Sequence, residues 1–218
     1  MAPGTVNLPW GIAAGGTAIT ETELAFEEEL LAFGVGLDEL EAAFAILVRE
    51  VWEGIDSAME PLWSSDDERR QLAATCDIGS LLEAEPIESN GVCRLLLDVE
   101  AEVAAESVSR SVAAPLLAIS RYGDDWTRIT LFERGKSRAW LFWASSSWIN
   151  GHENELEPAL ASAARASGGW LGEPADFELL LARGCSRSDL RRLLETGFDS
   201  AAEFADGFRR LVGAPELI

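Results

Sequence analysis

The sequence predicts an α+β fold, with helices on either side of a central antiparallel sheet. Capping sequences and helical spacing dominate residues 1–85, apolar and polar residues alternate between 92 and 148, and short leucine-containing segments that end in glycine follow within 153–213. Because helical and strand segments are grouped rather than alternating, an α+β arrangement is favoured over a parallel βαβ sheet. A chain of 218 residues, 48% of them hydrophobic, fits one compact domain covering residues 1–218.

The first expected helix runs over about residues 21–33. Thr20-Glu-Thr-Glu23 has the spacing of a capping box, and Phe26, Leu30 and Phe33 recur at i, i+4 and i+7. Three consecutive acids are then expected on the solvent side of this helix: Glu27, Glu28 and Glu29.

Two further helices complete an acidic helical layer over residues 1–85. The longer one begins at Asp38 and ends before Pro61, because proline interrupts helical hydrogen bonding. The other starts with a capping box at Ser65 and runs past Leu72 toward Leu82.

Residues 92–148 are expected to form an antiparallel sheet of three to four strands. Cys93 to Val103 alternates apolar and polar side chains, as in a half-buried strand, although the alanines and glutamates of 98–106 also allow a strand that gives way to a helix. Pro115 places the segment 107–120 at a sheet edge or a bend, and Gly123-Asp124-Asp125 is expected to make the turn into the next strand. The strongest signal is a β-hairpin over 126–144, in which two aromatic and β-branched runs flank a polar turn at Gly135.

The C-terminal segment, residues 153–213, is expected to be helical. One helix covers Asn154 to Ala166, and three shorter helices end at Gly184, Gly197 and Gly213, since glycine commonly terminates a helix.

The chain is strongly acidic, because 38 acidic residues against 17 basic ones give a net charge of −21. Residues 1–108 hold 23 acids and 4 bases (−19), whereas residues 109–218 hold 15 acids and 13 bases (−2). A field of this sign repels nucleic acids and anionic membranes and attracts basic proteins. Solubility alone is the alternative reason for the charge. The arginines of the one locally basic stretch, 121–138, are expected to pair with acids of the first half.

The cysteines indicate a reducing compartment. Cys76, Cys93 and Cys185 are widely spaced and odd in number, which favours unpaired thiols in the cytoplasm. The first 20 residues are uncharged but lack the basic start of a signal peptide, and no apolar run reaches the ~18–20 residues that cross a bilayer. We therefore expect a soluble cytoplasmic protein.

His152 is the only histidine, which limits both catalysis and metal binding. Neither a metal site nor a cofactor is expected, because two histidine ligands cannot come from one chain and the cysteines lack ligand spacing. The weak catalytic candidates are His152 with Glu153, just after the hairpin, and Cys185, near a helix start where the dipole favours a thiolate. The favoured interpretation of residues 150–155 is a solvated loop that caps the next helix.

The sequence therefore favours an acidic cytoplasmic protein-binding module that sequesters or escorts a basic protein partner, as an immunity protein, an antitoxin or a secretion chaperone does. The alternative is a small enzyme that uses His152 and Glu153, or Cys185, in a pocket beside the sheet. Surface charges steer association, and tryptophans often anchor an interface. The expected partner-binding residues are Glu27, Glu28, Glu29, Asp66, Asp67, Glu68, Trp148 and Trp170.

Overall fold

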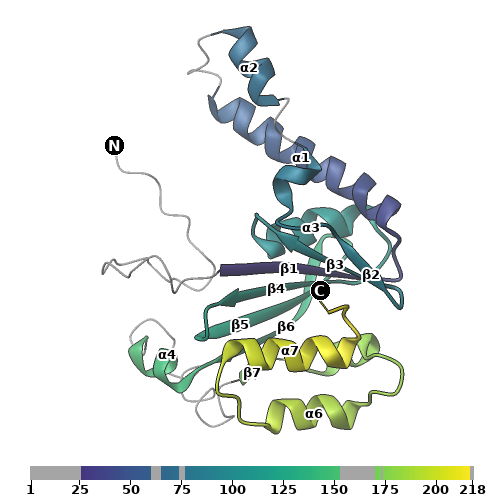
Figure 1. Ribbon diagram of the computed structural model, residues 1–218, viewed down its shortest axis with the longest axis vertical. Helices are drawn as coiled ribbons and strands as arrows, with labels where there is room; N and C mark the ends of the chain where they lie inside the picture. The colour runs from purple at the N-terminus through teal and green to yellow at the C-terminus, as the bar shows by residue number, and fades with distance from the viewer. Residues whose placement is uncertain (1–25, 60–64, 74–76, 153–169, 173, 217–218) are drawn as a thin grey trace.

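The computed structural model describes residues 26–59, 65–73, 77–152, 170–172 and 174–216. It confirms the α+β class: one antiparallel sheet has α1 and α3 on one face and α6 and α7 on the other (Figure 1). The sheet has seven strands in the order β2-β3-β1-β4-β5-β6-β7, so the expected three to four strands were too few. The strands are β1 (Phe26–Phe33), β2 (Ile87–Ser89), β3 (Val92–Leu97), β4 (Leu116–Tyr122), β5 (Trp126–Glu133), β6 (Lys136–Ala144) and β7 (Trp170–Gly172).

The main error of the sequence prediction is the helix over 21–33, because residues 26–33 form strand β1. This strand lies inside the sheet, between β3 and β4, so both of its edges are hydrogen-bonded. Leu30 and Leu31 point to opposite faces and are both fully buried. The i, i+4, i+7 spacing is thus coincidental, and packing on both faces overrides the helical propensity of the glutamates.

The segment after β3 follows the alternative interpretation, a strand that gives way to a helix. Strand β3 ends at Leu97, and α3 (Ala101–Ser111) begins four residues later. Ala101, Ala104 and Val108 lie on its buried face. Pro115 lies at the bend before β4, and β4 is an inner strand paired with β1 and β5 rather than a sheet edge.

The hairpin over 126–144 is confirmed as β5 and β6. Its two-residue turn, Arg134-Gly135, has φ of 53° and 72°, the left-handed pair of a type I′ turn. Asn90-Gly91 makes the same kind of turn between β2 and β3, with φ of 53° and 75°.

The remaining helices largely match the prediction. α1 (Leu37–Met59) and α2 (Asp66–Ala73) are confirmed, but a short 3₁₀ helix η2 (Ile78–Leu81) lies where the third helix was expected to continue. The C-terminal part contains the 3₁₀ helix η3 (Pro174–Leu180), α6 (Arg187–Glu195) and α7 (Ala201–Val212), which ends at Gly213 with φ of 73°. The short α4 (Ser146–Gly151) follows β6, and the expected helix from Asn154 to Ala166 lies outside the described residues.

Two apolar cores lie on opposite faces of the sheet. One joins α1 and α3 to β1, β3 and β4, with Phe44 and Leu30 among its fully buried side chains. The other joins α6, α7 and η3 to β4, β5 and β6, with Phe204 and Phe208 at its centre. Both cores pack against the same sheet, which lies between them.

Candidate functional site

The three consecutive glutamates expected on a solvent-facing helix lie in strand β1, where they alternate between the two faces of the sheet. Glu28 and Glu29 are buried, and only Glu27 is partly exposed. Glu27 is held by an ion pair with Arg121 of the neighbouring strand β4. The expected surface placement of Glu28 and Glu29 is therefore wrong, because both carboxylates have partners inside the fold.

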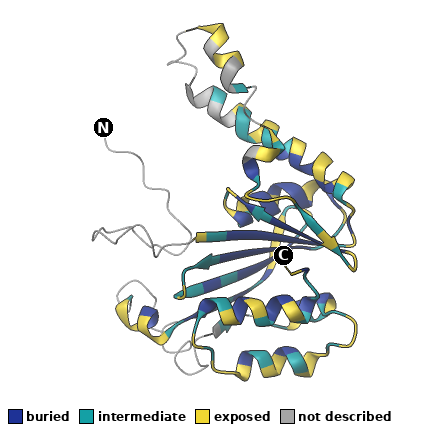
Figure 2. Ribbon diagram, in the orientation of Figure 1, coloured by how far each residue is buried: buried dark blue, intermediate teal, exposed yellow. Residues whose placement is uncertain are grey.

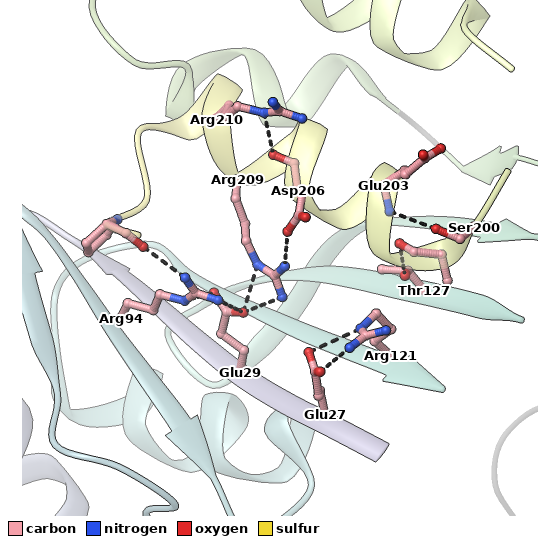
Figure 3. Close-up of polar contacts among 12 residues, drawn as sticks. Glu27, Glu29, Arg94, Arg121, Thr127, Ser200, Glu203, Asp206, Arg209 and Arg210 are labelled. Carbon is pink, nitrogen blue, oxygen red and sulfur yellow. Dashed lines mark hydrogen bonds and ion pairs between the residues drawn. The ribbon is translucent and has the colours of Figure 1, made fainter. Parts of the chain in front are cut away.

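Glu29 is the centre of a buried ion cluster between the sheet and α7, drawn in Figure 3. Its carboxylate, 1% exposed, lies 2.9 Å from Nε of Arg94 on β3 and 2.6 Å from a terminal nitrogen of Arg209 on α7. Arg209 also pairs with Asp206 at 2.6 Å, and Arg94 donates to the carbonyl of Pro215 at 2.9 Å. Two arginines and two carboxylates thus balance, and the cluster fixes α7 and the following chain to the sheet.

Glu28 points to the other face and holds the start of α3. Its Oε2 accepts hydrogen bonds from the backbone N–H of Ala101 at 2.8 Å and from the hydroxyl of Ser120 at 2.7 Å. Its Oε1 is buried with no hydrogen-bond partner among the described residues. Burial, aided by the nearby charges of Glu100 and Glu102, raises the pKa of Glu28 to about 7.

The other expected partner-binding residues are divided between the surface and the interior. Asp66 and Asp67 are exposed on α2, as expected, while the side chain of Glu68 lies outside the described part. Trp148 is buried at the start of α4, so its expected role as an exposed anchor is not supported by its position. Trp170 pairs with Trp143 through the backbone of β7, and its side chain is not among those described.

The catalytic candidates are not brought together. His152 follows α4, where its ring stacks on Trp148 at 4.5 Å and its Nδ1 lies 2.9 Å from the Trp148 carbonyl oxygen. The start of α7 lies near α4, because Ala201 donates to the carbonyl of Asp124 and Ser145 to that of Asp125. Cys185 lies near the end of α7, because its N–H donates to Ala182, whose own N–H donates to Leu211. That helix has 12 residues, about 18 Å of length. Glu153 lies outside the described residues.

The thiol of Cys93 is also unsuited to nucleophilic chemistry. It is fully buried and donates to the carbonyl of Val35 at 3.1 Å, and burial raises its pKa to about 11. Cys76 lies outside the described residues.

Two shallow hollows open on the helical side of the molecule, away from these candidates. One, of about 350 Å³, is bordered by Trp52 of α1 and by α2, and the other, of about 440 Å³, lies between α1 and η2. Among the described residues, no three His, Cys, Asp or Glu side chains are grouped as metal ligands. None of the helices in this part of the chain has the length and apolar character needed to cross a membrane.

Most described arginines are engaged by carboxylates of the same chain. In the locally basic stretch, Arg121 pairs with Glu27 of β1, Arg128 with Glu102 of α3 and Arg138 with Glu133. The expected pairing of this stretch with the first half is therefore confirmed for Arg121 and Arg128. Within the described residues, several exposed carboxylates have no such ion pair; they include Asp38, Glu39, Glu41, Asp98, Glu100 and Asp124.

The register of the sheet builds a contiguous set of rings that the sequence did not predict. Phe26, Tyr122 and Trp126 are directly opposite one another on β1, β4 and β5, with centroids 5.7 to 6.0 Å apart. Trp126 then contacts Phe142 of β6 at 6.0 Å, and Phe142 contacts Trp148 of α4 at 5.7 Å. We call these five residues the aromatic row.

The contact between two members of the aromatic row, Tyr122 and Trp126, could have been predicted from the sequence. The turn at Gly123–Asp125 was predicted, and it makes Tyr122 and Trp126 cross-strand neighbours. Phe26 could not be added, because the sequence placed it on a helix.

Three polar side chains lie next to the row on the same face of the sheet. Glu28 and Ser120 are each two residues from a row member on the same strand, so their side chains share its face. Arg128 lies opposite Phe142 and pairs with Glu102 at 2.8 Å, which ties β5 to α3. The aromatic row and these bonded polar groups form the surface that we consider the candidate binding site. Comparison of the chain with protein-family models, curated proteins and solved structures finds no match.

Proposed function

We propose that this protein is a non-catalytic binding module that sequesters or escorts a basic protein partner in the cytoplasm, as an immunity protein, an antitoxin or a secretion chaperone does. The observation that supports this function best is the distribution of charge. The chain has 38 acids and 17 bases, and most described arginines are already held in ion pairs with its own carboxylates.

The acids that are left over are exposed, so the surface presents negative charge with few free cations to offset it. Such a field raises the association rate of a positively charged protein and disfavours nucleic acids and acidic proteins. The exposed acids of α2, Asp66 and Asp67, contribute to this field, although Asp67 also pairs with Arg70 at 3.3 Å.

Nothing in the described structure favours the enzyme alternative. The ring of His152 is engaged by Trp148, and Cys185 is about the length of a helix away from it. The arrangement therefore does not place Cys185 and His152 at the hydrogen-bonding distance that a nucleophile and its base need.

The test is to capture the partner from the native host, identify it and measure its association rate at low and at physiological salt. We expect a basic partner whose association slows about tenfold over this range, at the lower end of electrostatic steering. A matched pair of variants separates charge from folding. Glu39→Gln with Glu41→Gln removes two exposed acids and should slow association, whereas Arg134→Gln with Lys136→Gln removes two exposed bases and should not.

An acidic partner would contradict the proposal. So would an association rate that is indifferent to salt and to the loss of exposed acids, because the charge would then serve solubility alone.

A further inference from the structure

The aromatic row lies on a part of the sheet that the two cores leave partly exposed. On the same face of β1, Leu30 is fully buried beneath α1 and α3, whereas Phe26 at the start of the strand keeps 50% of its surface exposed. Figure 2 shows the beginning of β1 as exposed and its inner part as buried. The other rings of the row are half-buried, apart from Trp148. Aromatic side chains grouped in this way are enriched at protein interfaces.

The row is separate from the interior that stabilises the fold. Trp126 and Phe142 pack on a small cluster formed by Ala144, Trp148 and Ile149, which belongs to neither of the two large cores. A ligand that contacts the row therefore need not disturb either core.

The border of the row is acidic. Asp124 and Asp125 form the turn between Tyr122 and Trp126, and their carboxylates have no ion pair within the described part of the chain. On the side of α3, the exposed carboxylate of Glu100 is close enough to Glu28 to act on its charge.

The cations beside the row are already neutralised. Arg128, on the face of the row, lies 2.8 Å from Glu102, and Arg121, on the opposite face, is held by Glu27. The border thus offers a ligand negative charge next to the faces and edges of the rings, and charge complementarity calls for a cation.

We propose that the aromatic row docks a segment of the partner that presents arginine or lysine side chains, whose cations lie over the rings and pair with the bordering carboxylates. A cation within about 6 Å of a ring face is attracted by the ring quadrupole, most strongly for tryptophan. A second copy of this chain is a poorer occupant, because it carries the same net charge of −21. This inference rests on the proposed function and names its binding surface.

The probe is a fluorescein-labelled dodecapeptide of alternating arginine and serine, measured by fluorescence anisotropy at physiological ionic strength. A second peptide replaces arginine with citrulline, which keeps the shape and removes the charge. The row variant Tyr122→Leu with Trp126→Leu keeps the net charge and apolar surface but removes two rings. We expect it to bind the arginine peptide about tenfold more weakly than the wild type, and the citrulline peptide to bind poorly to both.

A second pair of variants tests the acids at the border of the row. Both variants remove two negative charges, but at different places on the surface. Asp124→Asn with Asp125→Asn neutralises two carboxylates next to the row and keeps the backbone carbonyls that accept from Ala201 and Ser145. Glu39→Gln with Glu41→Gln neutralises two exposed carboxylates beyond the other end of β1. We expect the border variant to lose at least threefold more affinity than this control, because only its acids adjoin the rings.

Two further measurements distinguish a loss of binding from a loss of folding. Phe26→Leu changes one half-exposed ring and should weaken binding about threefold without a change in thermal unfolding. In the wild type, the indole N–H resonance of Trp126, identified by its loss in Trp126→Leu, should shift on addition of the peptide, while that of Trp52 on α1 should not.

Equal affinity of the wild type and both row variants, together with an unshifted Trp126 resonance, would overturn the docking surface and leave the proposed function standing. Failure of the wild type to bind the arginine peptide or any basic partner would overturn the proposed function itself.

Discussion

Substitution of Glu28 by glutamine is expected to remove a pH dependence of stability that runs opposite to that of most carboxylates. Burial raises the pKa of Glu28 from 4.5 to about 7, and Glu100 and Glu102 add to the effect. Between these two values the folded protein keeps a proton that the unfolded chain releases. The stability that Glu28 contributes is therefore complete below pH 4.5 and is lost as pH rises through 7.

The size of the effect follows from the difference between the two pKa values. A change of about 2.5 units corresponds to about 3 kcal/mol at 1.36 kcal/mol per unit, an upper limit that structural relaxation reduces. Glutamine keeps an oxygen that can accept from Ala101 and Ser120, and its N–H₂ stands in for the O–H of the protonated acid. The variant therefore represents the protonated state at every pH.

The assay is urea unfolding of the wild type and Glu28→Gln from pH 5 to 8.5. At each pH the free energy of unfolding of the wild type is subtracted from that of the variant, because the contribution of all other acids is then removed. We expect the free energy of unfolding of the variant, relative to the wild type, to rise by about 2–3 kcal/mol from pH 5 to 8. Glu106→Gln, on the exposed side of α3, is the matched control for replacing a carboxylate by an amide in the same assay.

A flat difference for Glu28→Gln, or a wild type that gains on the variant as pH rises, would show that Glu28 is ionised in the folded protein over the whole range. The carboxylate would then have a cationic or donor partner that the described structure lacks, and the account of its buried Oε1 would be wrong.

Three further outcomes follow from the geometry. Glu29→Gln should lower the free energy of unfolding by about 3–5 kcal/mol in urea titration, because Arg94 and Arg209 lose their shared counter-ion; a loss below 1 kcal/mol would contradict a buried cluster. Gly172→Ala should lower the melting temperature, since φ is 128° and an added Cβ would clash with the Trp140 carbonyl oxygen; an unchanged melting temperature would refute this contact. His152→Ala should change stability by less than about 1 kcal/mol, measured in the same way, because its ring stacks on Trp148 at the edge of the fold.

The elements that the sequence predicted correctly are those specified by neighbours in the chain. The hairpin of β5 and β6 is encoded by two apolar runs around Arg134-Gly135, whose left-handed conformations select a type I′ turn. Helix α7 has its cap at Ser200 and its end at Gly213, both visible as local signals.

Strand β1 shows why local signals fail in the middle of a sheet. Its glutamates favour a helix in isolation, and their partners are 65 to 180 residues away in the sequence. Strands β2 and β7 have three residues each, too few for a period to be recognised. The Asn90-Gly91 pair before β3 is nevertheless a local signal for a hairpin, and from it β2 could have been predicted.

The same dependence on distant pairing changes what the acidic composition means. A count of charge treats Glu27, Glu28 and Glu29 as equivalent, yet the structure gives them three different surroundings: an ion pair with Arg121, a protonatable site beneath α3 and a buried cluster with two arginines. Net charge therefore does not identify which acids are free to meet a partner. The aromatic row depends on the same pairing of β1 with β4, since only that register sets Phe26 against Tyr122. The proposed binding surface shares one face of β1 with Glu28, while Glu29 lies on the other face, and mutations meant to alter recognition must therefore leave the register of β1 intact.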